Sequence, residues 1–260
     1  MKQIVCLKVT PKVNQIKFDE QKKTVLRDGV ENEIDDADKN ALEMALSVKD
    51  KLGGTVTVLS MGPPLFEPFL RLAVAMGADD ATLLSDRSFA GADTFATSKV
   101  LATAIQKMAP FDLVYCGEAS ADGSTEQVPP SIAEWLQVPG ITYVTELDSD
   151  GRSLKAKRNI RGGHEVVEAK APALLSVELG CNTPRFPNFK RKQWADKEFK
   201  PTVWGMQDLS LKPDEVGDRG SLTTVSELKS MRSVDRKGEF VEGETQEVAS
   251  RLAQIIGESE

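Results

Sequence analysis

Four short apolar runs that alternate with helix-periodic segments determine the fold class of the first half of this chain. The runs cover residues 4–9, 55–60, 81–84 and 112–116. Between them, residues 41–46 and 100–108 carry apolar side chains at the spacing of one helical face. Strands that alternate with helices in this way pair in parallel. The sequence therefore predicts an α/β fold built on a wound, mainly parallel sheet.

The second half of the chain has a different pattern. Residues 142–147, 153–159, 165–170 and 173–179 read as strands that are separated by Asp-Ser-Asp-Gly and Arg-Gly-Gly turns. This pattern predicts an antiparallel extension of the sheet. Residues 181–220 contain few apolar runs and several prolines, so we expect a C-terminal arm that wraps a partner. Residues 245–256 predict a terminal amphipathic helix.

The junction after the strand at 112–116 has the composition of a phosphate-binding loop. It runs Gly-Glu-Ala-Ser-Ala-Asp-Gly-Ser-Thr-Glu-Gln-Val from residue 117 and ends in two prolines, which fit only near the first turn of a helix. Unpaired N–H groups at a helix start attract an anion. We expect Gly123 to allow close approach and Ser124, Thr125 and Gln127 to add donors. The helix itself is expected to begin near Thr125. A plain loop with a Ser/Thr helix cap has the same residues and stays open as an alternative.

A second cluster of hydroxyl groups lies at the start of the helix predicted after residue 91. Thr94 and Thr97 are three residues apart and share a face, and capping leaves the Thr97-Ser98 pair unexplained. Donors of this kind suit the carbonyl and imide groups of a flavin ring. Ligands of open parallel sheets bind beyond the carboxyl ends of the strands. This rule selects the loops after Val9, Ser60, Leu84 and Cys116.

No catalytic device is evident in the sequence. The only histidine, His164, lies in a predicted turn, and no metal-ligand spacing occurs. Asp35, Asp36 and Asp38 precede a helix and fit ordinary helix-start chemistry, although Asp38 could accept a hydrogen bond from a ribose or an adenine. We therefore assign no catalytic and no metal-binding residue, and expect a bound cofactor to supply the chemistry.

Composition excludes several classes of partner and location. A net charge of −7 argues against nucleic acid as the main partner. The three cysteines are too few and too scattered to indicate a disulfide framework. The chain starts without a secretion signal and contains no run of about 20 apolar residues, so we expect a cytoplasmic protein without membrane insertion.

Several motifs together resemble the β subunit of electron transfer flavoprotein over nearly the whole chain. They lie at residues 5–9, 25–30, 41–46, 61–64, 75–79, 117–130, 158–176 and 182–186. Arg161 departs from the pattern, because an acidic residue is usual there. The resemblance implies a Rossmann-like domain at residues 1–180, a recognition loop and extended arm at 181–220, and a C-terminal segment with a terminal helix at 221–260.

The resemblance also implies a heterodimer with an α subunit that carries FAD, and a second nucleotide in the β subunit. That nucleotide is AMP in simple electron carriers. In bifurcating members it is FAD, which accepts hydride from NADH and sends single electrons to the α-subunit FAD and to ferredoxin or flavodoxin. Residues 91–98 and 122–128 resemble the bifurcating group, so we favour FAD. Residues 35–38 depart from that group's pattern, because they retain only the final Asp. A non-catalytic module that senses nucleotides is a further alternative.

Carried over position by position, the resemblance implies two sets of functional residues. The cofactor-binding set is Cys6, Leu7, Asp38, Met61, Gly62, Thr94, Thr97, Cys116, Gly117, Ala119, Asp122, Gly123, Ser124, Thr125, Gln127 and Val128. In the recognition loop, Phe189 would dock on an acyl-CoA dehydrogenase, flanked by Lys190 and Arg191. An apolar anchor beside basic residues is typical of an interface hot spot.

Overall fold

A computed structural model describes residues 1–12, 17–19, 24–26, 31–226, 238 and 240–257 of the chain. The chain divides into two compact units, Met1–Glu227 and Leu228–Glu260. Of the motifs noted above, residues 27–30 lie outside the described ranges. The same is true of residues 227–237, 239 and 258–260 of the predicted C-terminal segment.

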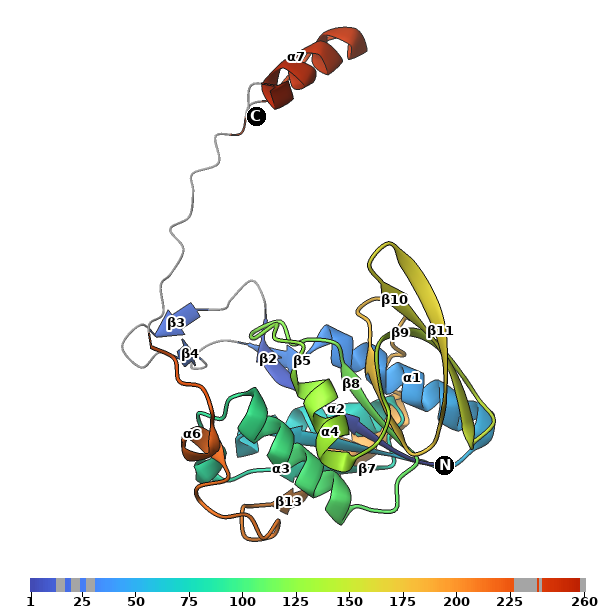
Figure 1. Cartoon of the computed structure of the whole chain (residues 1–260), viewed down its shortest axis with the longest axis vertical. Coiled ribbons are helices and arrows are strands. Elements are labelled where there is room, and N and C mark those ends of the chain that lie inside the picture. Colours follow the sequence, from blue (N-terminus) through green and yellow to red (C-terminus); the bar gives the residue numbers. More distant parts are fainter. Residues whose placement is uncertain (13–16, 20–23, 27–30, 227–237, 239, 258–260) are drawn as a thin grey trace. The chain divides into compact units, whose positions relative to one another are not determined.

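A nine-stranded sheet forms the centre of the first unit (Figure 1). Its strands, in spatial order, are β11 (Gly163–Lys170), β10 (Ser153–Ile160), β9 (Gly140–Ser149), β12 (Ala173–Val177), β8 (Leu113–Gly117), β1 (Lys2–Cys6), β6 (Thr55–Met61), β7 (Asp80–Leu84) and β13 (Thr202–Trp204). From β9 and β12 through to β13 every neighbouring pair is parallel. The α/β fold with a mainly parallel wound sheet is therefore confirmed.

Helices cover both faces of the parallel strands. On one face, α1 (Asp36–Leu52) and α2 (Glu67–Met76) pack on a cluster that includes Val5, Val58 and Tyr115. On the other face, α3 (Thr94–Lys107) and α4 (Val128–Leu136) pack beside each other on Ile4 and Val114. Successive side chains of a strand point to opposite faces, so strands buried on both sides need continuous apolar runs. The apolar stripes predicted at 41–46 and 100–108 are buried in these two clusters.

The antiparallel extension is shorter than predicted. β9 pairs with β10, and β10 with β11, in antiparallel register. However, β12 pairs in parallel with both β8 and β9, so the expectation of an antiparallel strand at 173–179 is wrong. All five residues of β12 are buried. Continuous burial is typical of a central parallel strand rather than of a half-exposed one.

The segment after residue 181 packs on the same unit to a larger extent than its composition suggested. β13 extends the main sheet by pairing with β7. Helix α5 (Phe189–Lys197) packs against α2, and Ala195 and Leu209 are buried. The short helix α6 (Gly217–Gly220) follows. A role of this segment in wrapping a partner stays a prediction.

Smaller elements complete the described chain. Two-stranded sheets form between β2 (Val9–Pro11) and β5 (Asn32–Ile34) and between β3 (Lys17–Asp19) and β4 (Thr24–Leu26). Short 3-10 turns occupy Pro64–Phe66 and Arg87–Phe89. In the second unit, α7 (Thr245–Gly257) is the predicted terminal helix, and none of its residues is buried. None of the helices in the described ranges has the length and apolar character needed to span a bilayer.

Candidate functional site

The residues expected to bind a cofactor come together at the carboxyl ends of the central strands. Neighbouring strands β1, β6 and β8 end at Cys6, Met61 and Gly117, which places three of the predicted segments side by side. Helices α3 and α4 follow β7 and β8 of the parallel sheet and begin at this edge (Figure 1). The start of α1, which follows β5, is joined to the ends of β1 and β8 through Asp38. The helix starts contribute Asp38, Thr94, Thr97 and Val128.

Asp38 joins the ends of β1 and β8 to the start of α1. Its Oδ2 accepts from the backbone N–H of Lys8 at 2.6 Å, and its Oδ1 accepts from that of Gly117 at 2.7 Å. Burial, and then the nearby Asp35 carboxylate, raise the pKa of Asp38 to about 7. Both oxygens already serve the protein's own backbone. The Asp38 side chain therefore holds the ends of β1 and β8 together, rather than pointing freely at a ribose or an adenine.

We expect Asp38→Asn to lower the free energy of unfolding by about 2 kcal/mol, because the new amide group must face one of two backbone donors and leave it unpaired. Urea denaturation measures the change. Asp36→Asn is the matched control on the same helix, since Asp36 is exposed and its side chain bonds, among the described residues, to Lys39 alone, at 2.7 Å. Its effect should stay within about 0.5 kcal/mol. Equal losses in the two variants would contradict this role of Asp38.

Two residues outside the predicted set hold the loop at 118–127 against the rest of the site. Asp35 accepts from the backbone N–H of Ala121 at 2.7 Å and also caps α1. Lys8 donates from Nζ to Ser120 at 2.9 Å and forms an ion pair with Asp122. Lys8 and Asp122 are 114 residues apart in sequence. No local sequence pattern could therefore have identified this contact.

Helix α4 begins at Val128, later than the start near Thr125 that the sequence suggested. Ser124 and Glu126 adopt left-handed backbone angles, with φ of 45° and 60°, which interrupts the helix before Val128. No side chain caps α4, and its second and third residues are prolines. In the described part of the chain, the N–H groups of Thr125, Gln127 and Val128 make no hydrogen bond. Thr125 and Gln127 are exposed and Val128 is half-buried. Unpaired amides at a helix start are able to bind an anion.

Packing explains two of the three glycines of the predicted site. A Cβ at Gly117 would lie 2.8 Å from Ala37 and from the Asp38 carboxylate, and one at Gly62 would lie 2.2 Å from the Phe66 ring. At Gly123 a Cβ would make only ordinary contacts, the nearest at 3.4 Å. Internal packing therefore requires Gly62 and Gly117. Packing of this kind does not require a glycine at Gly123.

The start of α3 is linked directly to the loop before α4. Thr94 donates from Oγ1 to Oε1 of Gln127 at 2.8 Å. Ser98, in contrast, is fully buried, donates to the carbonyl of Phe95 and accepts from Trp135 Nε1 at 3.2 Å. Helix packing thus explains Ser98. Thr94 and Thr97 are both half-buried, and the Thr94 hydroxyl, whose hydrogen goes to Gln127, can still accept a hydrogen bond.

Cys6 and Cys116 are neighbours on β1 and β8. Val5 is paired with Tyr115, so the two cysteines follow at the next position of the register. The hydrogen bond with Cys6, together with burial, raises the pKa of Cys116 well above its usual value. The thiol therefore stays protonated. In the described ranges, no group of three or more His, Cys, Asp and Glu side chains has the arrangement of a metal site.

The predicted partner-binding residues lie at the start of α5. Phe189 is 81% exposed and Lys190 is exposed. Arg191 instead donates to the carbonyls of Val74 and Ala78, at 3.1 and 2.6 Å, and so fixes α5 to the end of α2. Phe186, which the sequence analysis did not select, is 92% exposed. The described surface thus presents two aromatic side chains here.

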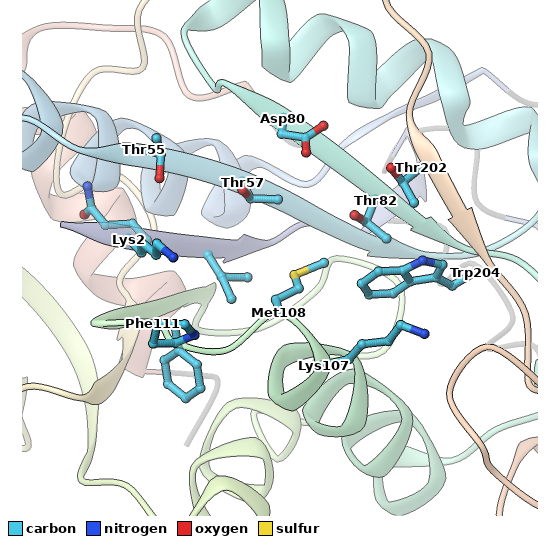
Figure 2. Close-up of a pocket in the computed structure, with 13 residues that line it drawn as sticks. Lys2, Thr55, Thr57, Asp80, Thr82, Lys107, Met108, Phe111, Thr202 and Trp204 are labelled. Atoms are coloured by element: carbon cyan, nitrogen blue, oxygen red, sulfur yellow. The ribbon is translucent and has the colours of Figure 1, made fainter.

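A cavity of about 370 Å³ lies at the opposite edge of the sheet. Its lining includes the first residues of β1, β6, β7 and β13, so it lies at the amino ends of the strands. Figure 2 shows threonines from these strands facing Met108 and Phe111, which follow the end of α3. None of the predicted cofactor-binding residues lines this cavity.

Comparison with known proteins identifies the family of the chain. A model of the electron transfer flavoprotein domain matches residues 22–202. The chain belongs to the electron transfer flavoprotein family. The family resemblance predicted from the sequence is therefore confirmed, and the matched residues include every predicted cofactor-binding position except Cys6 and Leu7.

Relatives within the electron transfer flavoprotein family align with almost the whole chain. The electron transfer flavoprotein subunit beta of Thermoanaerobacterium thermosaccharolyticum is 41% identical over 97% of this chain and 96% of its own length. The subunit of the same name from Clostridium acetobutylicum is 41% identical over 98% of this chain and 97% of its own length. The caffeyl-CoA reductase-Etf complex subunit CarD of Acetobacterium woodii is 39% identical, over 99% and 98%. The likeness within the family is thus to β subunits.

Proposed function

We propose that this chain binds FAD at the carboxyl edge of its sheet and acts as the β subunit of a bifurcating electron transfer flavoprotein. The observation that carries the proposal is the uncapped start of α4, where exposed amides precede two prolines. A diphosphate placed there would accept hydrogen bonds from these amides and interact favourably with the helix dipole.

The rest of the edge suits the other parts of a dinucleotide. Thr94 and Thr97 at the start of α3 offer hydroxyl groups toward a flavin ring. Gln127 retains its side-chain N–H₂, because within the described ranges the bond from Thr94 uses its Oε1 alone. Gly123 leaves room for close approach of a phosphate. Lys8 adds a positive charge to this loop, which it contacts through Ser120 and Asp122.

Bound FAD would supply the redox chemistry: uptake of two electrons as hydride from NADH, and release of single electrons to the α-subunit FAD and to ferredoxin or flavodoxin. The protein's own residues bind and orient. Asp35 and Lys8 hold the loop at 118–127, and Asp38 holds the ends of β1 and β8. The start of α4 supplies positive potential at the phosphates.

The proposed partners follow the same assignment. An α subunit completes the heterodimer in our proposal, and an acyl-CoA dehydrogenase docks on Phe189 and Phe186. The related CarD protein is named as part of a caffeyl-CoA reductase-Etf complex, which supports a coenzyme A-linked partner.

The nucleotides released from the purified heterodimer test this proposal. Denaturation followed by chromatography should release FAD at two molecules per heterodimer, without AMP. One FAD and one AMP per heterodimer would contradict the bifurcating assignment and select the simple electron carrier. A stable lone β chain that carries AMP would favour the nucleotide-sensing module.

A further inference from the structure

The carboxylate of Asp93 holds two separate segments of the chain at the edge of the candidate site. Its Oδ1 accepts from the backbone N–H of Ala96 at 2.9 Å and caps α3. Its Oδ2 accepts from the backbone N–H groups of Leu222 and Thr223 and from the Thr223 hydroxyl, each at 2.9 Å. We call Asp93, Ser221, Leu222 and Thr223 the clasp.

Further contacts fix the clasp on the body of the protein. The backbone N–H of Asp93 donates to Ser221 Oγ at 2.8 Å, and Ser221 Oγ donates to the carbonyl of Gly217 at 2.8 Å. Gly217 has a φ of 58°, and a Cβ there would lie 2.1 Å from the carbonyl oxygen of Ser88. The chain around residues 217–223 therefore follows the loop before α3 closely.

Helix capping alone does not account for Asp93. Capping uses one oxygen, and Ser, Thr or Asn would serve equally well. Three donors converge on the second oxygen, and hydrogen bonds to a charged acceptor are stronger than neutral ones. Partial burial tends to raise the pKa of Asp93, but the hydrogen bonds from Ala96, Thr223 and Leu222 outweigh it and lower the pKa below its usual value. The carboxylate is therefore ionised when the clasp is formed.

The clasp shares the first turn of α3 with the candidate nucleotide site. Thr94 follows Asp93 directly and is bonded to Gln127 in the loop before α4. Thr97 lies one turn further on, and its backbone N–H donates to the carbonyl of Asp93 at 2.9 Å. On the other side, the chain continues from the clasp toward residues 224–260. Asp93 thus contacts both the helix turn that carries Thr94 and Thr97, the predicted flavin contacts, and residues 221–223, which lead into the C-terminal segment.

We propose that Asp93 couples nucleotide binding to the attachment of residues 221–226, an inference that rests on the proposed function of the site. A nucleotide that contacts Thr94 and Thr97 orders the first turn of α3. The Asp93 carboxylate is then already positioned, so closing the clasp costs less conformational entropy. Linkage requires the reverse effect to be equal: a closed clasp strengthens nucleotide binding by the same factor.

Hydrogen exchange of the purified heterodimer tests the first direction. FAD and AMP are added separately to protein stripped of nucleotide, and exchange is followed in peptides that cover 118–128 and 221–226. We expect each bound nucleotide that engages α3 to slow exchange in both peptides, by about fivefold or more at 221–226. In Asp93→Ser, which keeps a good helix cap but loses the second oxygen, 118–128 should still be protected and 221–226 should not.

Thr223→Pro tests the reverse direction, because it removes two of the three clasp donors without changing α3. We expect the nucleotide affinity of the heterodimer to fall by about fivefold or more, by the same linkage. The matched control is Thr224→Pro, since the N–H of Thr224 makes no hydrogen bond in the described part of the chain. Its affinity should equal that of the wild type.

The outcomes separate the two proposals. Protection at 118–128 without any change at 221–226 would overturn the coupling and leave the proposed function standing. No protection at either peptide with FAD or AMP would overturn both. Equal nucleotide affinity in wild type, Thr223→Pro and Thr224→Pro would also overturn the coupling.

Discussion

Gly117→Ala should unfold far more easily than the wild type, with a loss of about 3 kcal/mol in the free energy of unfolding. The added Cβ would lie 2.8 Å from backbone and side-chain atoms of Ala37 and from Asp38 Oδ1. Neither neighbour is the free end of a flexible side chain, because Asp38 is held by two backbone donors. Overpacking costs about 1–3 kcal/mol, and weakening the bond from Gly117 N–H to a buried carboxylate adds about 1.5 kcal/mol or more. Chemical denaturation measures the loss.

Gly123→Ala is the matched control for that prediction. Its Cβ would meet Ser120 Oγ at 3.4 Å and Lys8 Nζ at 3.8 Å, which are ordinary contacts. The free energy of unfolding should therefore change by less than about 1 kcal/mol. Nucleotide affinity should nevertheless fall by about tenfold or more, equivalent to roughly 1.4 kcal/mol, because the methyl group occupies the approach to the loop amides. Unchanged nucleotide affinity in Gly123→Ala would argue against a phosphate at this position.

Replacing both Phe186 and Phe189 with Ala should slow electron exchange with the proposed acyl-CoA dehydrogenase partner about 100-fold or more at limiting partner concentration. Hot-spot side chains contribute about 2 kcal/mol or more each to an interface, and both rings are strongly exposed on the described chain. Stability should not change, since neither ring belongs to the core. The rate is measured by flavin absorbance after mixing the heterodimer with reduced dehydrogenase.

Val166→Ala controls for the general loss of exposed apolar surface. Val166 lies on the edge strand β11 and is 51% exposed. It should leave the electron-exchange rate unchanged. The single variants Phe186→Ala and Phe189→Ala then show which ring is the main anchor. Rates in the double variant equal to those of Val166→Ala would rule out α5 as the docking site.

The sequence predicted the strands of the sheet well where they are apolar and separated by helices. β6, β7 and β8 lie at the predicted positions, because their apolar runs match two buried faces. β12 was assigned to the wrong kind of pairing. In the sheet, β12 lies between β8 and β9, although it follows both of them in the sequence. Spacing along the sequence does not reveal that a later strand inserts between two earlier ones.

Within the candidate site, the location of the loop and of Thr94 could be predicted from the sequence, but the residues that they contact could not. The approximate location of the loop and of Thr94 followed from strand ends and helix starts. The start of α4 was placed too early, because left-handed backbone at Ser124 and Glu126 has no strong sequence signal for residues of these types. Lys8, Asp35 and the second role of Asp93 depend on contacts between distant segments, which single-sequence patterns do not encode.

A crystal structure of the heterodimer with the nucleotides that copurify would locate the nucleotide in this chain. We expect FAD with its diphosphate within hydrogen-bond distance of the amides of Thr125, Gln127 and Val128, and its ring next to Thr94 and Thr97. A nucleotide bound at the amino ends of the strands, or a loop at 118–128 whose amides contact only protein, would contradict this expectation.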